Sequence, residues 1–212
     1  MDKTDGIRNL DNAAMAETTT PEMRIPYESC VMEGIPDPCM VVIVGASGDL
    51  TARKIVPALF NLFLTGGLPD PFLVVGCART QLNHEEFRDK MKNALKIANI
   101  LDDQKWQDFS KSLYYQAIDY GELSSFKALA RSLGELDKKH GTGWNRVFYL
   151  AIPPSLYQST AQMLGKAGLS GKTERKMWAR IVVEKPFGRN LETAIDLDRD
   201  RKSTRLNSSH RL

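Results

Sequence analysis

The chain has 212 residues and a formal net charge of +3, with 42% hydrophobic and 26% charged residues. That length suits one α/β domain with its own core, and so small a charge argues against nucleic-acid binding. We find no apolar run of membrane-spanning length and no basic-then-apolar secretion signal at the start. The three cysteines lack metal-ligand spacing and suit a reducing compartment. We therefore expect a cytoplasmic globular protein that binds no metal, nucleic acid or membrane.

Residues 1–38 are polar and contain several prolines, which predicts a flexible N-terminal arm. The apolar β-branched run at 41–44 predicts a buried strand. Helical and strand periodicities then predict, in chain order, a helix from residue 50, a strand at 72–77, helices at 83–98 and 103–112, a strand at 113–118, a helix at 123–140, a strand at 146–152, a helix at 155–167, a buried strand at 178–184 and a helix from about 191.

This alternation of strands and helices predicts a doubly wound, mostly parallel sheet with helices on both faces. We assign it to residues 39–199. Ligands of such sheets bind beyond the carboxyl ends of the strands. The residues that follow the strands should therefore meet at one rim: Gly45 to Asp49, Ala78 to Thr80, Asp119 and Tyr120, Pro153 and Pro154, and Lys185.

The turn after the first strand contains Gly45 and Gly48 and leads directly into a helix, which Ser47 or Asp49 can cap. A strand, a glycine turn and a helix N-terminus together form an anion site, because backbone N–H groups and the positive end of the helix dipole face the ligand. The pattern is Gly-x-x-Gly-x-x-Thr rather than the full Gly-x-Gly-x-x-Gly. An ordinary strand-to-helix turn without a ligand is the alternative.

The residues after the second strand bear on the choice of cofactor. NAD-binding domains usually place an acidic residue there for the ribose hydroxyls, whereas NADP needs a cation. This chain has Arg79 and no acid at that position, and a guanidinium can bind a 2′-phosphate with two hydrogen bonds. Arg53 and Lys54 can add charge. The alternatives are a surface ion pair for Arg79 and simple solvation for the other two.

Four further residues at or near the rim each allow two interpretations. Asp119 is either a hydrogen-bond acceptor for the cofactor or a turn residue, and Tyr157 faces either the core or the cofactor. Lys185 ends a strand next to the expected nicotinamide, where its ammonium can hold a substrate hydroxyl or phosphate; otherwise it is an exposed lysine before a turn. Glu184 is either its partner or a structural anchor.

Four motifs follow one another along the chain: Gly-Ala-Ser-Gly-Asp-Leu at 45–50 with Arg53 and Lys54, Gly-Cys-Ala-Arg at 76–79, Phe-Tyr-Leu-Ala-Ile-Pro-Pro at 148–154, and Glu-Lys-Pro-Phe-Gly at 184–188. The set closely resembles the N-terminal domain of the glucose-6-phosphate dehydrogenases. The resemblance implies a Rossmann-type NADP-binding domain of an oxidoreductase. That enzyme passes a hydride from C1 of glucose 6-phosphate to NADP and forms 6-phosphoglucono-1,5-lactone in the pentose phosphate pathway.

The resemblance also implies site residues. Lys185 would contact both the cofactor and the sugar phosphate. The positions that would bind NADP are Gly45, Ala46, Ser47, Gly48, Asp49, Leu50, Thr51, Arg79, Asp119, Tyr120, Tyr157 and Lys185.

The chain also departs from the family. The family's Arg-Ile-Asp-His-Tyr-Leu-Gly-Lys segment is absent, and residues 200–212 look non-native, like a translated adaptor. We therefore expect a truncated protein that lacks the C-terminal α+β domain, through which the full-length enzyme would form a homo-oligomer. The general-base histidine is expected downstream, so no residue here is assigned as catalytic. His84 and His140 are expected to be surface helix residues, and the fragment should bind cofactor only.

Two other functions compete with this one. A non-catalytic NADP-sensing module would keep the same rim but would not need the substrate lysine. A short-chain reductase or epimerase would need a Tyr-x-x-x-Lys pair, but the residue four positions after Tyr157 is Ala161.

Overall fold

The computed structural model describes residues 36–170 and 177–184 of the chain. Its described strands form one parallel sheet, as the sequence predicted, and their order in the sheet is β3-β2-β1-β4-β5. The strands are β1 (Cys39–Val44), β2 (Phe72–Ala78), β3 (Leu113–Ala117), β4 (Arg146–Leu150) and β5 (Ala179–Val183). Residues 1–35, Lys185, the helix expected from residue 191 and the segment 200–212 lie outside the described residues.

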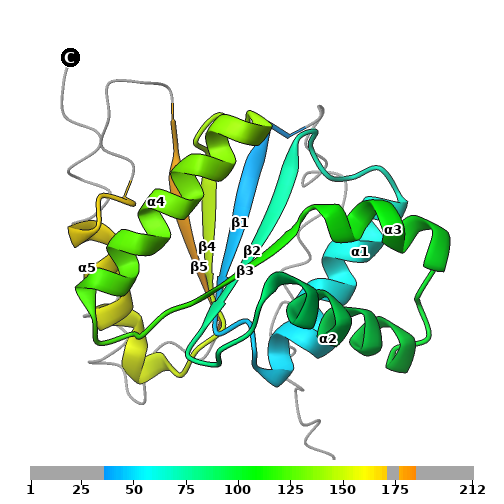
Figure 1. Cartoon of the computed structure of the whole chain (residues 1–212), viewed down its shortest axis with the longest axis horizontal. Helices are drawn as coiled ribbons and strands as arrows, with labels where there is room; N and C mark the ends of the chain where they lie inside the picture. The colour runs from blue at the N-terminus through cyan, green and yellow to red at the C-terminus, as the bar shows by residue number, and fades with distance from the viewer. Residues whose placement is uncertain (1–35, 171–176, 185–212) are drawn as a thin grey trace, which may run out of the picture. The chain divides into compact units, whose positions relative to one another are not determined.

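Helices cover both faces of the sheet, which confirms the doubly wound, Rossmann-type architecture (Figure 1). One face carries α1 (Val56–Leu64), preceded by the π-helical turn η2 (Thr51–Ile55), and the helices α2 (His84–Ile97) and α3 (Asp103–Lys111). The other face carries α4 (Leu123–His140) and α5 (Tyr157–Lys166), the latter preceded by the 3-10 turn η3 (Pro154–Leu156). The central strand β1 is consequently buried on both faces.

Local capping explains where several helices begin and end. Asn83 and Glu86 form a reciprocal capping box at the start of α2, and the carboxylate of Asp102 accepts two backbone N–H groups at the start of α3. Gly141 ends α4 with a φ of 74°, a left-handed conformation that glycine adopts without strain. These three signals are local in the sequence, so the helix ends predicted from the sequence lie within one residue of the observed ends.

Strand β5 differs from expectation. The sequence predicted a buried strand, but Ile181 and Val182 are 43% and 38% exposed. The physical reason is its position, because β5 pairs only with β4 and forms an edge of the sheet in the described structure. Its apolar composition is typical of a strand that is covered on both faces.

A buried ion pair joins the two ends of the α4–β4 connection. The guanidinium Nη2 of Arg146 lies 2.5 Å from Oδ2 of Asp137, and their side chains are 8% and 0% exposed. The Thr142 hydroxyl also donates to Asp137, and the Arg146 guanidinium lies 5.3 Å from the centroid of the Trp144 ring. Because Arg146 is the first residue of β4, this cluster lies at the edge of the sheet opposite the carboxyl ends.

Candidate functional site

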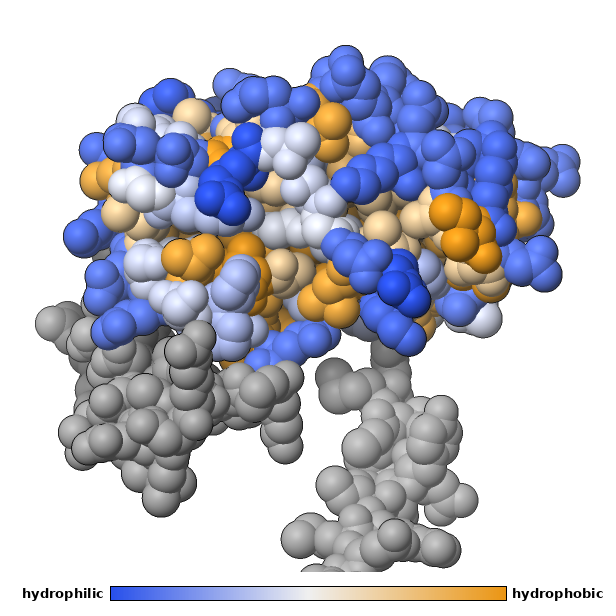
Figure 2. Space-filling model, turned by 90° about the horizontal axis from the view of Figure 1, so that it is seen from below, coloured by the Kyte–Doolittle hydropathy of each residue, from blue (hydrophilic) through white to orange (hydrophobic). Residues whose placement is uncertain are grey.

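The carboxyl ends of the four strands β1 to β4 lie level with one another. Val44 pairs in register with both Cys77 of β2 and Leu150 of β4, and Ala78 of β2 pairs with Ala117 of β3. The residues that follow these strands therefore lie along one edge, as the sequence predicted. Figure 2 views the molecule from this side and shows apolar surface interspersed with strongly hydrophilic side chains.

The glycine turn is fixed by the neighbouring strands. The N–H groups of Gly45 and Ala46 both donate to the carbonyl oxygen of Cys77, at 2.7 and 3.0 Å. Gly45 has a φ of 96°, and a Cβ there would lie 2.2 Å from the carbonyl oxygen of Ala151. Close approach of the chain after β4 thus requires a glycine at 45, independently of any ligand.

The predicted side-chain cap is not formed, since no capping bond from a side chain precedes η2. Asp49 is already helical and its carboxylate Oδ2 lies 3.3 Å from Nη1 of Arg53, one turn ahead. The Ser47 hydroxyl instead accepts from the Thr80 hydroxyl at 3.0 Å. The first backbone N–H groups of a helix have no hydrogen-bond acceptor within the helix. In this chain the helix starts at the exposed residue Asp49, directly after the exposed Gly48.

The predicted turn residues differ in accessibility. Gly48 and Asp49 are exposed, and Ser47 and Leu50 are half-buried. Gly45, Ala46 and Thr51 are buried, and the Thr51 hydroxyl has no hydrogen-bond partner among the described residues. The buried members can shape the turn, whereas the accessible ones can contact a ligand.

Arg79 extends from the end of β2 toward Tyr120, which follows β3. Its guanidinium carbon lies 5.7 Å from the centroid of the Tyr120 ring, within the range of a cation–π contact. Burial raises the pKa of the Tyr120 hydroxyl, so the ring remains neutral at physiological pH. No carboxylate of the described residues lies within 4.0 Å of Arg79. The surface ion pair considered as an alternative is therefore not formed within this part of the chain.

For Asp119 and Tyr157 the structure shows the non-ligand roles. Asp119 is exposed, and its Oδ1 accepts from the backbone N–H of Gly121 at 2.8 Å, as in a turn. Tyr157 is only 5% exposed and belongs to the core between the sheet and the helices α4 and α5. Of the two, Asp119 is the one that a ligand can reach directly.

Glu184 is held by a tyrosine of the neighbouring strand. Its Oε1 accepts from the Tyr149 hydroxyl at 2.5 Å, which is the contact of a structural anchor. Burial, and then the hydrogen bond to Glu184, raise the pKa of Tyr149 to about 12. Lys185 itself lies outside the described residues.

This pairing predicts a late tyrosine titration. The folded pKa of Tyr149 exceeds its ordinary value of 10.0, so this group stabilises the fold below pH 10 and its contribution is lost as the pH rises toward 12. Phenolate absorbance should therefore show a tyrosine that ionises in this window, and Tyr149→Phe should remove one such group. An unchanged late titration in the variant would contradict the raised pKa of Tyr149.

The sequence analysis did not single out Lys90, yet it reaches the glycine turn. Its ammonium Nζ donates to the carbonyl oxygen of Ser47 at 2.5 Å, across 43 positions of sequence. The sequence offered no signal for this contact, because it depends on how α2 packs beside the turn.

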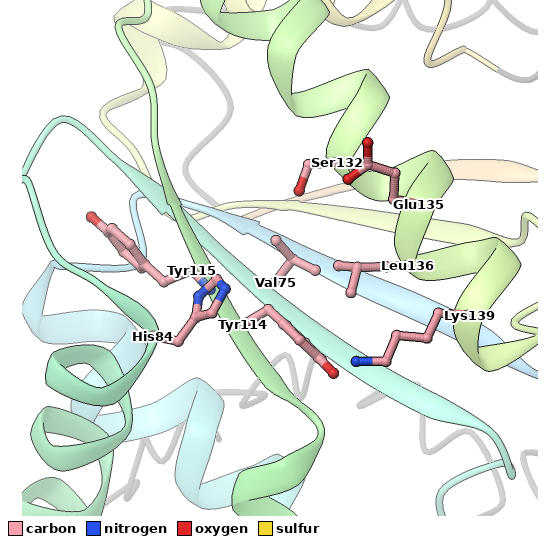
Figure 3. A pocket seen from close by; sticks show the side chains of 8 residues that line it. All are labelled: Val75, His84, Tyr114, Tyr115, Ser132, Glu135, Leu136 and Lys139. Atoms are coloured by element: carbon pink, nitrogen blue, oxygen red, sulfur yellow. The ribbon is translucent and has the colours of Figure 1, made fainter.

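A separate cavity of about 220 Å³ lies beside β3, away from the glycine turn (Figure 3). His84, at the start of α2, contributes to its lining, and its Nδ1 accepts from the backbone N–H of Tyr115 at 3.0 Å. His140 shares a 2.9 Å hydrogen bond with the Tyr114 hydroxyl, and burial lowers its pKa. Both histidines are helix residues, as expected, and both are engaged with β3 rather than the rim.

The described part of the chain holds neither a cluster of metal-ligating side chains nor a membrane-spanning helix. Within residues 36–170 and 177–184, no three His, Cys, Asp or Glu side chains gather as metal ligands would. In the same ranges, no helix is both long and apolar enough to cross a membrane.

Comparison with known families decides the assignment. Residues 42–207 match the family model described as "Glucose-6-phosphate dehydrogenase, NAD binding domain". The chain belongs to this family. The match extends into the segment 200–212 that we interpret as non-native, and that interpretation stays a prediction.

The relatives carry the same family name. A glucose-6-phosphate 1-dehydrogenase of Chlamydia pneumoniae is 42% identical over 164 residues, which cover 76% of this chain and 32% of the relative. A chloroplastic glucose-6-phosphate 1-dehydrogenase 1 of Arabidopsis thaliana is 40% identical over 164 residues, which cover 75% of this chain and 27% of the relative. The chain thus spans about a third of the length of the curated relatives it matches.

Solved structures agree with the fold. A glucose-6-phosphate dehydrogenase in complex with its substrate glucose-6-phosphate superposes with a TM-score of 0.68 at 33% identity, covering 78% of this chain and 34% of that one. A glucose-6-phosphate 1-dehydrogenase from Mycobacterium avium superposes with a TM-score of 0.66 at 28% identity, covering 79% of this chain and 34% of that one.

Proposed function

We propose that this chain is the cofactor-binding part of an enzyme that transfers a hydride from C1 of glucose 6-phosphate to NADP. The product would be 6-phosphoglucono-1,5-lactone, in the pentose phosphate pathway. Family membership and the names of the relatives support the reaction. The observation that carries the choice of NADP is Arg79, which stands at the end of β2 without a neighbouring carboxylate among the described residues.

The residues present fit a phosphorylated dinucleotide. The exposed start of the first helix offers N–H groups to phosphates, and Gly48 brings no side chain between them and a ligand. Ser47, Asp49 and Leu50 are accessible along the same turn, while Gly45, Ala46 and Thr51 hold its shape from below. When bound, NADP supplies the nicotinamide that accepts the hydride.

Arg79 and Tyr120 would form the adenosine side of this site. The guanidinium can bind a 2′-phosphate with paired hydrogen bonds while its flat face lies over the Tyr120 ring. Asp119 follows the same strand and its carboxylate can accept from a ribose hydroxyl. Tyr157 would act only indirectly, by supporting the chain after β4 from the core.

Lys185 is proposed to lie beside the nicotinamide and to hold the sugar phosphate. Glu184, the residue before it, is held by the Tyr149 hydroxyl of β4. The general base is not assigned, since His84 and His140 are engaged with β3. The chain as it stands is expected to bind cofactor without turnover, and NADPH formation from glucose 6-phosphate at an intact enzyme's rate would contradict this.

Arg79→Met tests the cofactor assignment. Charged hydrogen bonds contribute about 1.5–3 kcal/mol, so calorimetric titration should show NADP binding weakened about 10- to 100-fold. NAD lacks the 2′-phosphate, and its affinity should change less than about twofold by the same reasoning. Arg131→Met, on α4 at the other face of the sheet, is the matched control and should leave both affinities unchanged. A wild-type chain that binds neither nucleotide would overturn the proposal.

The remaining predictions concern the context of the protein. A non-catalytic NADP-sensing module would keep the same cofactor site. Lys185→Ala in a chain that includes the rest of the enzyme distinguishes this module from the dehydrogenase, because only the dehydrogenase should lose sugar-phosphate binding.

Homo-oligomerisation, a cytoplasmic location and the absence of nucleic-acid and membrane partners stay predictions. The unpaired, buried Cys39 and Cys77 fit the location.

A further inference from the structure

Lys90 on α2 connects this helix to the glycine turn. The neighbouring α2 residues Phe87 and Met91 are fully buried against the sheet, which fixes the helix beside the turn. From there the ammonium of Lys90 reaches the carbonyl oxygen of Ser47, with Nζ and O 2.5 Å apart. The positive charge thus stands at the turn itself, on the side of β2 and α2.

Ser47 links this charge to Arg79. The Ser47 hydroxyl accepts from the hydroxyl of Thr80 at 3.0 Å, and Thr80 directly follows Arg79 in the chain. The Ser47–Thr80 contact is therefore next to Arg79 in the chain, and the ammonium of Lys90 lies at the backbone carbonyl of the same Ser47. Guanidinium, ammonium and hydroxyl groups together are the groups that bind a phosphate dianion.

Among the described residues, no carboxylate neutralises the charge of Lys90 at close range. No carboxylate of the described residues lies within 4.0 Å of its ammonium, whereas Lys92 on the same helix pairs with Asp103 at 2.8 Å. Glu86, one turn before Lys90, is committed to the backbone N–H of Asn83 in the capping box. An ammonium has three N–H donors, so Lys90 retains donors beyond the one given to Ser47.

We propose that Lys90 is a second cation for the 2′-phosphate of NADP and, together with Arg79, determines the preference for NADP over NAD. The inference rests on the proposed function, because it assumes that the dinucleotide binds at this turn. The pyrophosphate would bind at the helix start, whereas Lys90 contacts Ser47, whose hydroxyl bonds to Thr80, the residue after Arg79. Its charge therefore acts on the group that only NADP carries.

The test compares Lys90→Met with Lys92→Met in the same chain, by calorimetric titration with NADP and with NAD. Lys92→Met removes the same charge from the same helix but lies against α3 through Asp103. Lys90→Met should weaken NADP binding about tenfold, the value of one charged hydrogen bond, and should change NAD binding less than about twofold. Lys92→Met should change neither, and Lys90→Arg should restore most of the NADP affinity. Lys90→Gln is the substitute if Lys90→Met does not fold.

Each other result has a definite meaning. Equal weakening of NADP and NAD would assign Lys90 to a phosphate that both share, and would overturn this inference. Unchanged binding of both would show that the lysine only ties α2 to the turn, and would overturn it as well. Absence of NADP binding by the unaltered chain would instead overturn the proposed function on which the inference rests.

Discussion

Replacing Gly45 with alanine should destabilise the fold by about 3 kcal/mol or more and abolish NADP binding. The new Cβ would lie 2.2 Å from the carbonyl oxygen of Ala151, a backbone atom that cannot rotate away. The residue would also hold a φ of 96°, which L side chains rarely adopt. The turn would have to leave β4, and its bonds to the Cys77 carbonyl would be lost.

Urea unfolding and calorimetric titration with NADP measure the two effects. Gly66→Ala is the matched control, because Gly66 has a φ of 70° but a Cβ there would meet no atom within 4 Å. Its cost should be limited to the backbone strain of about 1–2 kcal/mol. Gly48→Ala, at an ordinary φ, would meet only the Gly45 carbonyl oxygen at 3.1 Å and should fold. A stable, NADP-binding Gly45→Ala chain would disprove the geometry of the turn.

Asp137→Ala should cost about 3–5 kcal/mol of unfolding free energy, since it leaves a buried guanidinium without its counter-charge. The Arg146 side chain is 8% exposed, and its Nε already has no hydrogen-bond partner among the described residues. Replacing both partners, as Asp137→Leu with Arg146→Met, should be far less costly, because no charge is then left buried.

Urea unfolding of the single and double variants measures this. Asp108→Ala breaks an exposed pair with Lys111 at 2.8 Å and should have little measurable effect. The affinity for NADP should be retained in any variant that still folds, because Arg146 begins β4 at the edge opposite the rim. Equal stability of Asp137→Ala and the unaltered chain would contradict the buried pair.

Much of the fold was predictable because its signals are local. The helix at 123–140 was predicted with the bounds of α4, since Gly141 ends it. The strands at 72–77 and 113–118 differ from β2 and β3 by one residue each. The parallel sheet was predicted from the alternation of strands and helices, whereas the order of its strands is known only from the structure. The exposure of β5 was predicted wrongly. Its apolar composition shows that the strand is suited to burial, but whether it is buried depends on which elements pack beside it.

In the candidate site, too, some features follow from the sequence and others only from the tertiary structure. The sequence by itself determined which residues follow the strands, and so which side chains, such as Arg79, can stand at the rim. Only the tertiary structure decided that Ser47 binds Thr80 instead of capping the helix, that Tyr149 holds Glu184 and that Lys90 reaches the turn. Periodicity and turn chemistry depend on neighbours in the chain, whereas these contacts join residues 33 to 43 positions apart and depend on how the helices and strands pack.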